Sequence, residues 1–175
     1  MQKNSAKIKR VLPEICSRTD SQTQSFSVQA VAPRTVTDKL QRVLNAAARV
    51  IAGTRKFDSG LGQILHDQLH WLDVPDRVLF KLAVTVHQCL NGRAPPYLSE
   101  QCIPVSSADT RRHLRSANRH LLAVPRFPLN TYGRRAFSVA GPMAWNSFPD
   151  FIRDPTSSTD YFRRLLKTYS FARYY

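Results

Sequence analysis

Apolar residues recur at helical spacing in three stretches of the chain between residues 37 and 91. The first stretch covers 37–53, where Thr37 or Asp38 is the expected N-cap and Gly53 the stop. A shorter stretch covers 61–72. The third covers 74–91, with Asp73 as its expected N-cap and Pro75 in its first turn. We therefore expect three helices, with the strongly apolar third one central to the core.

The first of these helices has a charged and an apolar side. Lys39, Arg42 and Arg49 mark the charged side, which we expect to face outward. The apolar positions of the same helix are Leu40, Val43, Leu44, Ala47 and Ile51.

The pattern changes beyond residue 93. Three prolines between 94 and 104 predict a turn, with a single helical turn over 97–102. The segments 113–117, 120–125 and 135–140 are short and rich in alternating or β-favouring residues, which predicts a small antiparallel sheet or hairpins. Trp145 and Phe148 are expected in the core, and Ser158 or Thr159 caps a last helix.

Together these elements predict an α+β fold that is mainly α. It has three N-terminal helices packed together, a small antiparallel β segment and a C-terminal helix. Residues 1–35 lack a periodic apolar pattern and are expected to be a disordered or unrelated leader. The predicted units are then a helical subdomain over 36–102, a basic segment with short strands over 103–141, and a Trp-containing turn with the C-terminal helix over 142–175.

The charge balance points to an anionic partner. The 26 Lys and Arg against 12 Asp and Glu give a net charge of +14, which causes self-repulsion that a polyanion offsets. Between residues 103 and 140 lie seven arginines and a single acid, Asp109. Nucleic acid is the first candidate partner. A solvated charged surface is the alternative interpretation.

Several kinds of chemistry find no support in the sequence. The cysteines, Cys16, Cys89 and Cys102, form no CxxC pair, so we expect neither disulfides nor a zinc ribbon, and an intracellular setting in nucleus or cytoplasm. No signal peptide or membrane-spanning apolar run is visible. His66 and His70 are spaced to share a helix face, but without further ligands nearby we expect structural or surface histidines, and no metal or cofactor.

Catalytic motifs are missing as well. The chain has no Walker A loop, GxGxxG, GxSxG or HExxH motif, and no two acidic residues are adjacent. The paired carboxylates that hold two metals for nucleotidyl transfer are therefore not expected, and no local motif assembles a hydrolytic triad. We expect no enzyme activity.

Three blocks of the sequence carry a family resemblance. APRTVTDKLQRVLNAAARVIAGTRKFD, LHWLDVPDRVLFKLAVTVHQCLNGRAPPYL and RRHLRSANRHLLAVPRFPLNTYGRRAFSVAGPMAWNSFPDFIRD occur in this order. Together they resemble the C-terminal, post-polymerase region of jockey-like non-LTR retrotransposon reverse transcriptases, over about residues 32–166. In that family the Tyr-x-Asp-Asp box and the endonuclease lie upstream and have no counterpart here. The resemblance implies a truncated, non-catalytic remnant close to template RNA or target DNA.

The arginine-rich segment is the candidate binding site. Guanidinium groups bind phosphates in bidentate fashion, and an exposed aromatic ring offers a base a surface for stacking. The chain has no helix-turn-helix, zinc-finger or RRM signature, so we expect sequence-nonspecific binding of RNA or single-stranded DNA. The predicted binding residues are Arg111, Arg112, Arg115, Arg119, Arg126, Tyr132, Arg134 and Arg135.

Two other interpretations stay open at this point. The helices can be a docking fragment that packs on an upstream polymerase domain of a related element and exposes apolar surface when alone. Alternatively, the reading frame is a decayed insertion without a function.

Overall fold

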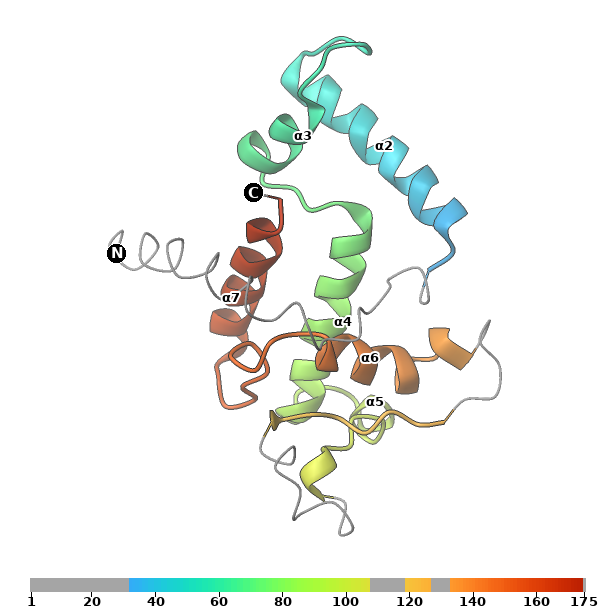
Figure 1. The fold of residues 1–175 in the computed structure, drawn as a ribbon, viewed down its shortest axis with the longest axis vertical. Helices are drawn as coiled ribbons and strands as arrows, with labels where there is room; N and C mark the ends of the chain where they lie inside the picture. The colour runs from blue at the N-terminus through green and yellow to red at the C-terminus, as the bar shows by residue number, and fades with distance from the viewer. Residues whose placement is uncertain (1–31, 108–118, 127–132, 175) are drawn as a thin grey trace, which may run out of the picture.

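The structure is a computed structural model, and it describes residues 32–107, 119–126 and 133–174. Within these residues the fold is mainly helical (Figure 1). In chain order the elements are α2 (Arg34–Ala52), α3 (Leu61–Gln63), the π-helical turn η2 (Ile64–Gln68), α4 (Val74–Leu90), α5 (Pro96–Ser99), the 3-10 turns η3 (Val105–Ser107) and η6 (Gly133–Arg135), α6 (Phe137–Asn146) and α7 (Thr159–Ala172).

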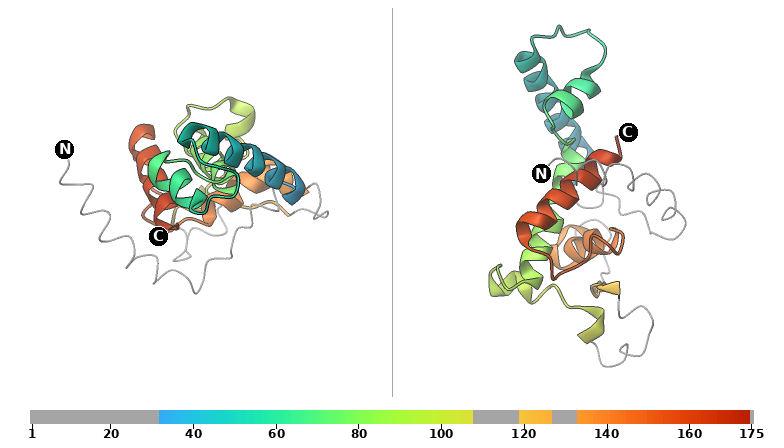
Figure 2. Two further views of the ribbon diagram at one scale, coloured as in Figure 1. Left: turned by 90° about the horizontal axis from the view of Figure 1, so that it is seen from above. Right: turned by 90° about the vertical axis from the view of Figure 1, so that its left-hand side faces the viewer.

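Helix α4 is the central element, as its sequence predicts. It contacts α2, α5, α6 and α7, and its buried residues include Leu79, Ala83 and Val86. Figure 2 shows α6 and α7 against α4 from two further directions, while α2 and α3 stand at one end of the molecule. The N-terminal helices therefore form an extension of the core rather than its centre.

The core lies between α4, α6 and α7. Trp145, Phe148 and Phe162 are almost completely buried, which confirms the expected inward packing of the two aromatic residues after Pro142. His87 is also buried and stacks on the Phe162 ring, with ring centroids 4.3 Å apart. Burial lowers the pKa of His87 below its ordinary value of 6.5, because the interior disfavours the charged imidazolium.

Local signals set several helix ends. Gly53 ends α2 in the left-handed region at φ 64°, where a glycine is favoured. The hydroxyl of Ser158 accepts a hydrogen bond from the Tyr161 amide at 3.3 Å and caps α7. Asp73 occupies the N-cap position of α4, but its side chain makes no capping bond. Instead, the Gln41 side chain on α2 accepts a hydrogen bond from the Val74 amide at 2.8 Å.

The prediction of an antiparallel β segment is wrong. Over the described part of the chain no strand forms, and β pairing is limited to an isolated antiparallel bridge between Pro104 and Leu122. The predicted strand 135–140 is mostly the first turn of α6, where Val139 and Ala140 are buried. The segment 113–117 lies outside the described residues, and 120–125 is extended around the bridge. The sequence over 137–140 looked like a strand because this part of the helix is largely buried, and periodicity alone does not distinguish a short buried helix segment from a strand.

The packed face of α2 also differs from the expected one. Thr37 and Ala48 are its buried residues, and Gln41 lies between them, whereas Leu40 and Val43 are exposed. The polar bonds of Gln41 to the start of α4 turn this side of the helix inward. The unit boundaries expected at 35, 102 and 141 stay predictions.

Candidate nucleic-acid interface

The structure describes half of the predicted binding residues. Arg111, Arg112, Arg115 and Tyr132 lie outside the described residues. Arg119 and Arg126 are exposed at the two ends of the segment 119–126. Arg135 is exposed in η6 directly before α6, and the backbone of Arg134 lies in the same turn. The described part of the candidate site is therefore centred on the segment 119–126 and its attachment to the folded core.

The end of α6 clamps this segment through its backbone. The Asn146 side chain accepts a hydrogen bond from the Leu122 amide at 2.9 Å and donates one to the Leu122 carbonyl at 2.8 Å. One residue earlier, the Trp145 indole N–H donates to the His120 carbonyl at 2.8 Å. Three hydrogen bonds from two neighbouring residues thus fix the middle of the segment, so that its ends project from a defined position.

A second set of bonds holds the opposite edge of the segment. The Val105 amide donates to the Leu121 carbonyl at 2.9 Å, and the Ala123 amide donates to the Ile103 carbonyl at 2.8 Å. The Leu122 side chain is 2% exposed and belongs to the core cluster. The segment is therefore held between residues 103–105 and α6, with the Leu122 side chain in the core.

A buried arginine is bonded to the end of α6 that clamps the segment. Arg153 is 5% exposed, donates to the Asn146 carbonyl at 3.1 Å and forms an ion pair with Asp150. Burial lowers the pKa of Arg153, and repulsion by the nearby Arg119 guanidinium lowers it further. Because Arg153 is paired with Asp150, it supports the end of α6 through the Asn146 carbonyl and adds no net positive charge to the segment.

The geometry suits binding of phosphate groups. Exposed guanidinium groups at Arg119, Arg126 and Arg135 donate several N–H bonds each and fit phosphate oxygens. The clamped backbone keeps the first two on a rigid support, which reduces the ordering cost of binding. Aromatic stacking cannot be placed, because Tyr132 lies outside the described residues.

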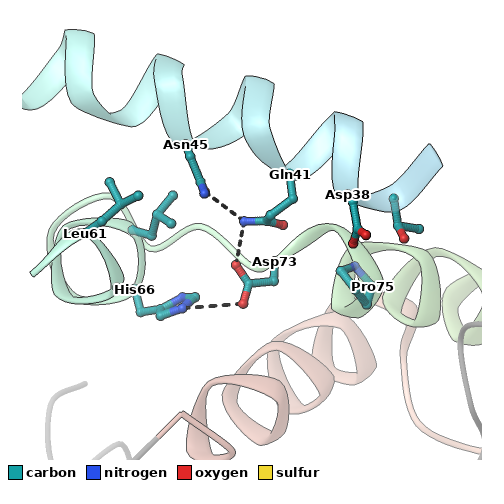
Figure 3. Close-up of a pocket in the computed structure, with 10 residues that line it drawn as sticks. Asp38, Gln41, Asn45, Leu61, His66, Asp73 and Pro75 are labelled. Atoms are coloured by element: carbon teal, nitrogen blue, oxygen red, sulfur yellow. Dashed lines mark hydrogen bonds and ion pairs between the residues drawn. The ribbon is translucent and has the colours of Figure 1, made fainter. Parts of the chain in front are cut away.

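The cavity at the other end of the molecule is polar and differs in character (Figure 3). It has a volume of about 380 Å³ and lies between α2, α3 and the start of α4. The Gln41 amide donates to the Asp73 carboxylate at 2.9 Å and to the Asn45 side chain at 3.0 Å. His66 lies 3.8 Å from the other Asp73 oxygen. Gln41, Asn45, Asp73 and His66 thus contact one another across the cavity and connect α2 with η2 and the start of α4.

The His66 ring is held in place by contacts on both its edges and its face. Its Nδ1 is 2.9 Å from the Trp71 carbonyl, its Nε2 pairs with Asp73, and its ring stacks on Tyr174 at 3.7 Å. His70 follows the π-helical turn at φ 49°, so the shared helix face expected for the two histidines does not form. Among the described residues no group of three or more His, Cys, Asp or Glu is placed to hold a metal.

Sequence reasoning missed the residues that position the segment. Trp145 was assigned to the core, but the bond from its indole to His120 was not foreseen, and nothing in the sequence marked Asn146 or Arg153. All three depend on partners 7 to 25 residues away.

Comparisons of the chain with protein-family models, with curated proteins and with solved structures found no match. The resemblance to reverse transcriptases therefore stays a prediction. No helix in the described ranges has both the length and the apolar character needed to cross a bilayer.

Proposed function

We propose that the chain is a non-catalytic module that binds RNA or single-stranded DNA through phosphates and without reading base sequence. We further propose that it derives from the post-polymerase region of a non-LTR retrotransposon reverse transcriptase. The module acts in the nucleus or the cytoplasm. It uses no metal or cofactor, because phosphate binding by guanidinium groups needs neither.

The observation that carries the proposal is the anchoring of an exposed cationic segment on the folded core. Asn146 and Trp145 fix the backbone of residues 120–122, and Arg119 and Arg126 extend to solvent on either side. The net charge of +14 adds long-range attraction for polyanions. The five other arginines between residues 103 and 140 supply further phosphate contacts.

Phosphate contacts explain why no base-reading geometry is required. The described part of the segment is held by its backbone, and its buried side chain, Leu122, faces the core. The charged groups that the segment exposes are Arg119 and Arg126, and cations of this kind recognise the phosphate backbone that all sequences share. The proposal thus predicts similar affinities for unrelated sequences of equal length.

The test is fluorescence anisotropy with one labelled RNA and one single-stranded DNA of the same sequence, at several salt concentrations. Affinity should fall steeply as salt rises from about 50 to 200 mM. In the variant Arg119→Glu with Arg126→Glu, the dependence of log K on log salt should become shallower by about 0.7 for each phosphate that the variant no longer neutralises. Affinity that is insensitive to salt contradicts the proposal.

A matched control separates the segment from the total charge. The variant Arg163→Glu with Lys167→Glu changes the net charge by the same amount, at exposed positions on α7. If the segment is the site, this control binds more tightly than the segment variant. An equal decrease in affinity in both variants contradicts the assignment of the site, because the net charge alone then sets the affinity.

A further inference from the structure

The outer side of α2 carries an apolar stripe, which consists of Val36, Leu40, Val43, Ala47 and Val50. The spacing between successive members is 4, 3, 4 and 3 residues, which places them within about 80° of one another around the helix axis. Leu40 is 52% exposed, Val43 67% and Val50 81%. The stripe is thus a line of aliphatic side chains that runs along the surface of this 19-residue helix.

Among the described residues, no element packs over the exposed members of this stripe. α2 packs through its other side, where Thr37 and Ala48 are buried and Gln41 bonds to the start of α4. In Figures 1 and 2, α2 and α3 stand at the end of the molecule opposite α5. An aligned row of exposed aliphatic side chains is typical of an interaction surface.

Cations lie along one edge of the stripe. By helical position, Lys39 lies directly beside the stripe on the side away from the buried face, and Arg42 and Arg49 lie one position further round the helix. Helix α2 holds four basic residues and one acid, Asp38, which pairs with Arg34 at 3.9 Å. The stripe is thus bordered by the body of the protein on one edge and by positive charge on the other.

We propose that the apolar stripe is a docking site for an amphipathic helix of another protein that carries acidic residues beside its own apolar seam. The 4-3 spacing is the spacing at which two helices interlock side chains along a shared seam. Acidic side chains on the partner would pair with Lys39, which occupies a flanking position of the seam, and Arg42 and Arg49 behind it would add to the attraction. Flanking charges select partners in helix pairs.

Charge argues against occupants from the chain itself. A second copy would bring another net charge of +14, and a second basic α2, against the first. Residues 1–31 contain five basic and two acidic residues, so they also lack the complementary charge. A bilayer is less suitable because α2 has no aromatic residue, and its cations follow only one edge of the stripe. An acidic helix satisfies both the apolar and the charged part of the surface.

The experiment uses the full chain and two labelled designed peptides of about four heptads, both with leucine along the seam. One peptide carries glutamate at the flanking positions and the other carries lysine. Fluorescence anisotropy should show binding of the glutamate peptide at least about tenfold tighter than the lysine peptide. The variant Leu40→Ser with Val43→Ser keeps all charges, and it should lose most of this binding while RNA affinity stays unchanged.

Charge reversal gives the second arm of the test. The variant Lys39→Glu with Arg42→Glu should prefer the lysine peptide, whereas Arg163→Glu with Lys167→Glu on α7 should keep the original preference. Equal affinity for both peptides, or peptide binding that survives loss of the stripe, overturns the proposal. A dimer in light scattering that the serine variant abolishes also overturns the proposal. Binding to vesicles of phosphatidylserine and phosphatidylcholine that the serine variant abolishes overturns it as well.

Discussion

Replacing Asn146 by alanine tests the clamp on which the candidate interface depends. The change removes one bond donated by the Leu122 amide and one accepted by its carbonyl, at 2.9 and 2.8 Å. Leu122 is buried, so both backbone groups lose partners where water has limited access. Each such loss costs about 1–3 kcal/mol, and we expect a total of about 2–4 kcal/mol because Asn146 is only half-buried.

Urea unfolding followed by circular dichroism measures this loss, with hydrogen exchange at the Leu122 amide as the local probe. The control is Asn45→Ala on α2, which makes the same chemical change within a helix but removes a single bond to the Gln41 side chain. The control should cost less than about 1 kcal/mol. The reasoning is refuted if both variants have the same free energy of unfolding, or if exchange at Leu122 does not accelerate.

Three further predictions concern other buried groups. The pKa of His87 is lowered in the folded state, so protonation favours unfolding and the free energy of unfolding should fall as the pH drops below 6.5. Unfolding curves of His87→Gln should lack this contribution to the pH dependence. Burial raises the pKa of Cys102 to about 12 and also raises that of Cys89. In a Cys16→Ser variant, both thiols should therefore react with an aromatic disulfide reagent only when the protein unfolds, and fast reaction in the native state contradicts this. Tyr174→Phe removes two hydrogen bonds at the start of α4 and should cost about 1–2 kcal/mol, and an unchanged urea midpoint contradicts the contact.

Local chemistry made much of the helical framework predictable. Gly53 supplies the left-handed residue that ends α2, and Ser158 supplies the oxygen that caps α7. These signals act within a few residues, so they are readable without knowledge of the fold. Pro75 in the first turn of α4 is a signal of the same kind.

Long-range packing decided what the sequence could not. Residues 137–140 are β-favouring in isolation, yet they are helical because α6 approaches α4 closely. A Cβ atom on Gly141 would lie 3.1 Å from Val86 Cγ2, so only a glycine permits this distance without displacement. The inward side of α2 was set by Gln41, whose partners lie more than 30 residues away. Periodicity alone assigns the apolar side to the core.

The candidate site was predictable as a region but not as a geometry. Charge counting located the arginine-rich segment, and the structure describes Arg119 and Arg126 on a clamped support. The hydrogen bonds of Asn146 and Trp145 to this segment join residues 24 and 25 positions apart, and no sequence motif predicts them. The burial of Arg153 against the end of α6 is equally invisible in a charge count.

Salt-dependent anisotropy with the labelled RNA tests the central proposal most directly. It compares the unchanged chain, Arg119→Glu with Arg126→Glu, and the charge-matched α7 variant Arg163→Glu with Lys167→Glu. The account predicts a steep salt dependence for the unchanged chain that is shallower in the first variant than in the second. Absence of RNA binding at low salt, or the same salt dependence in both variants, would contradict it.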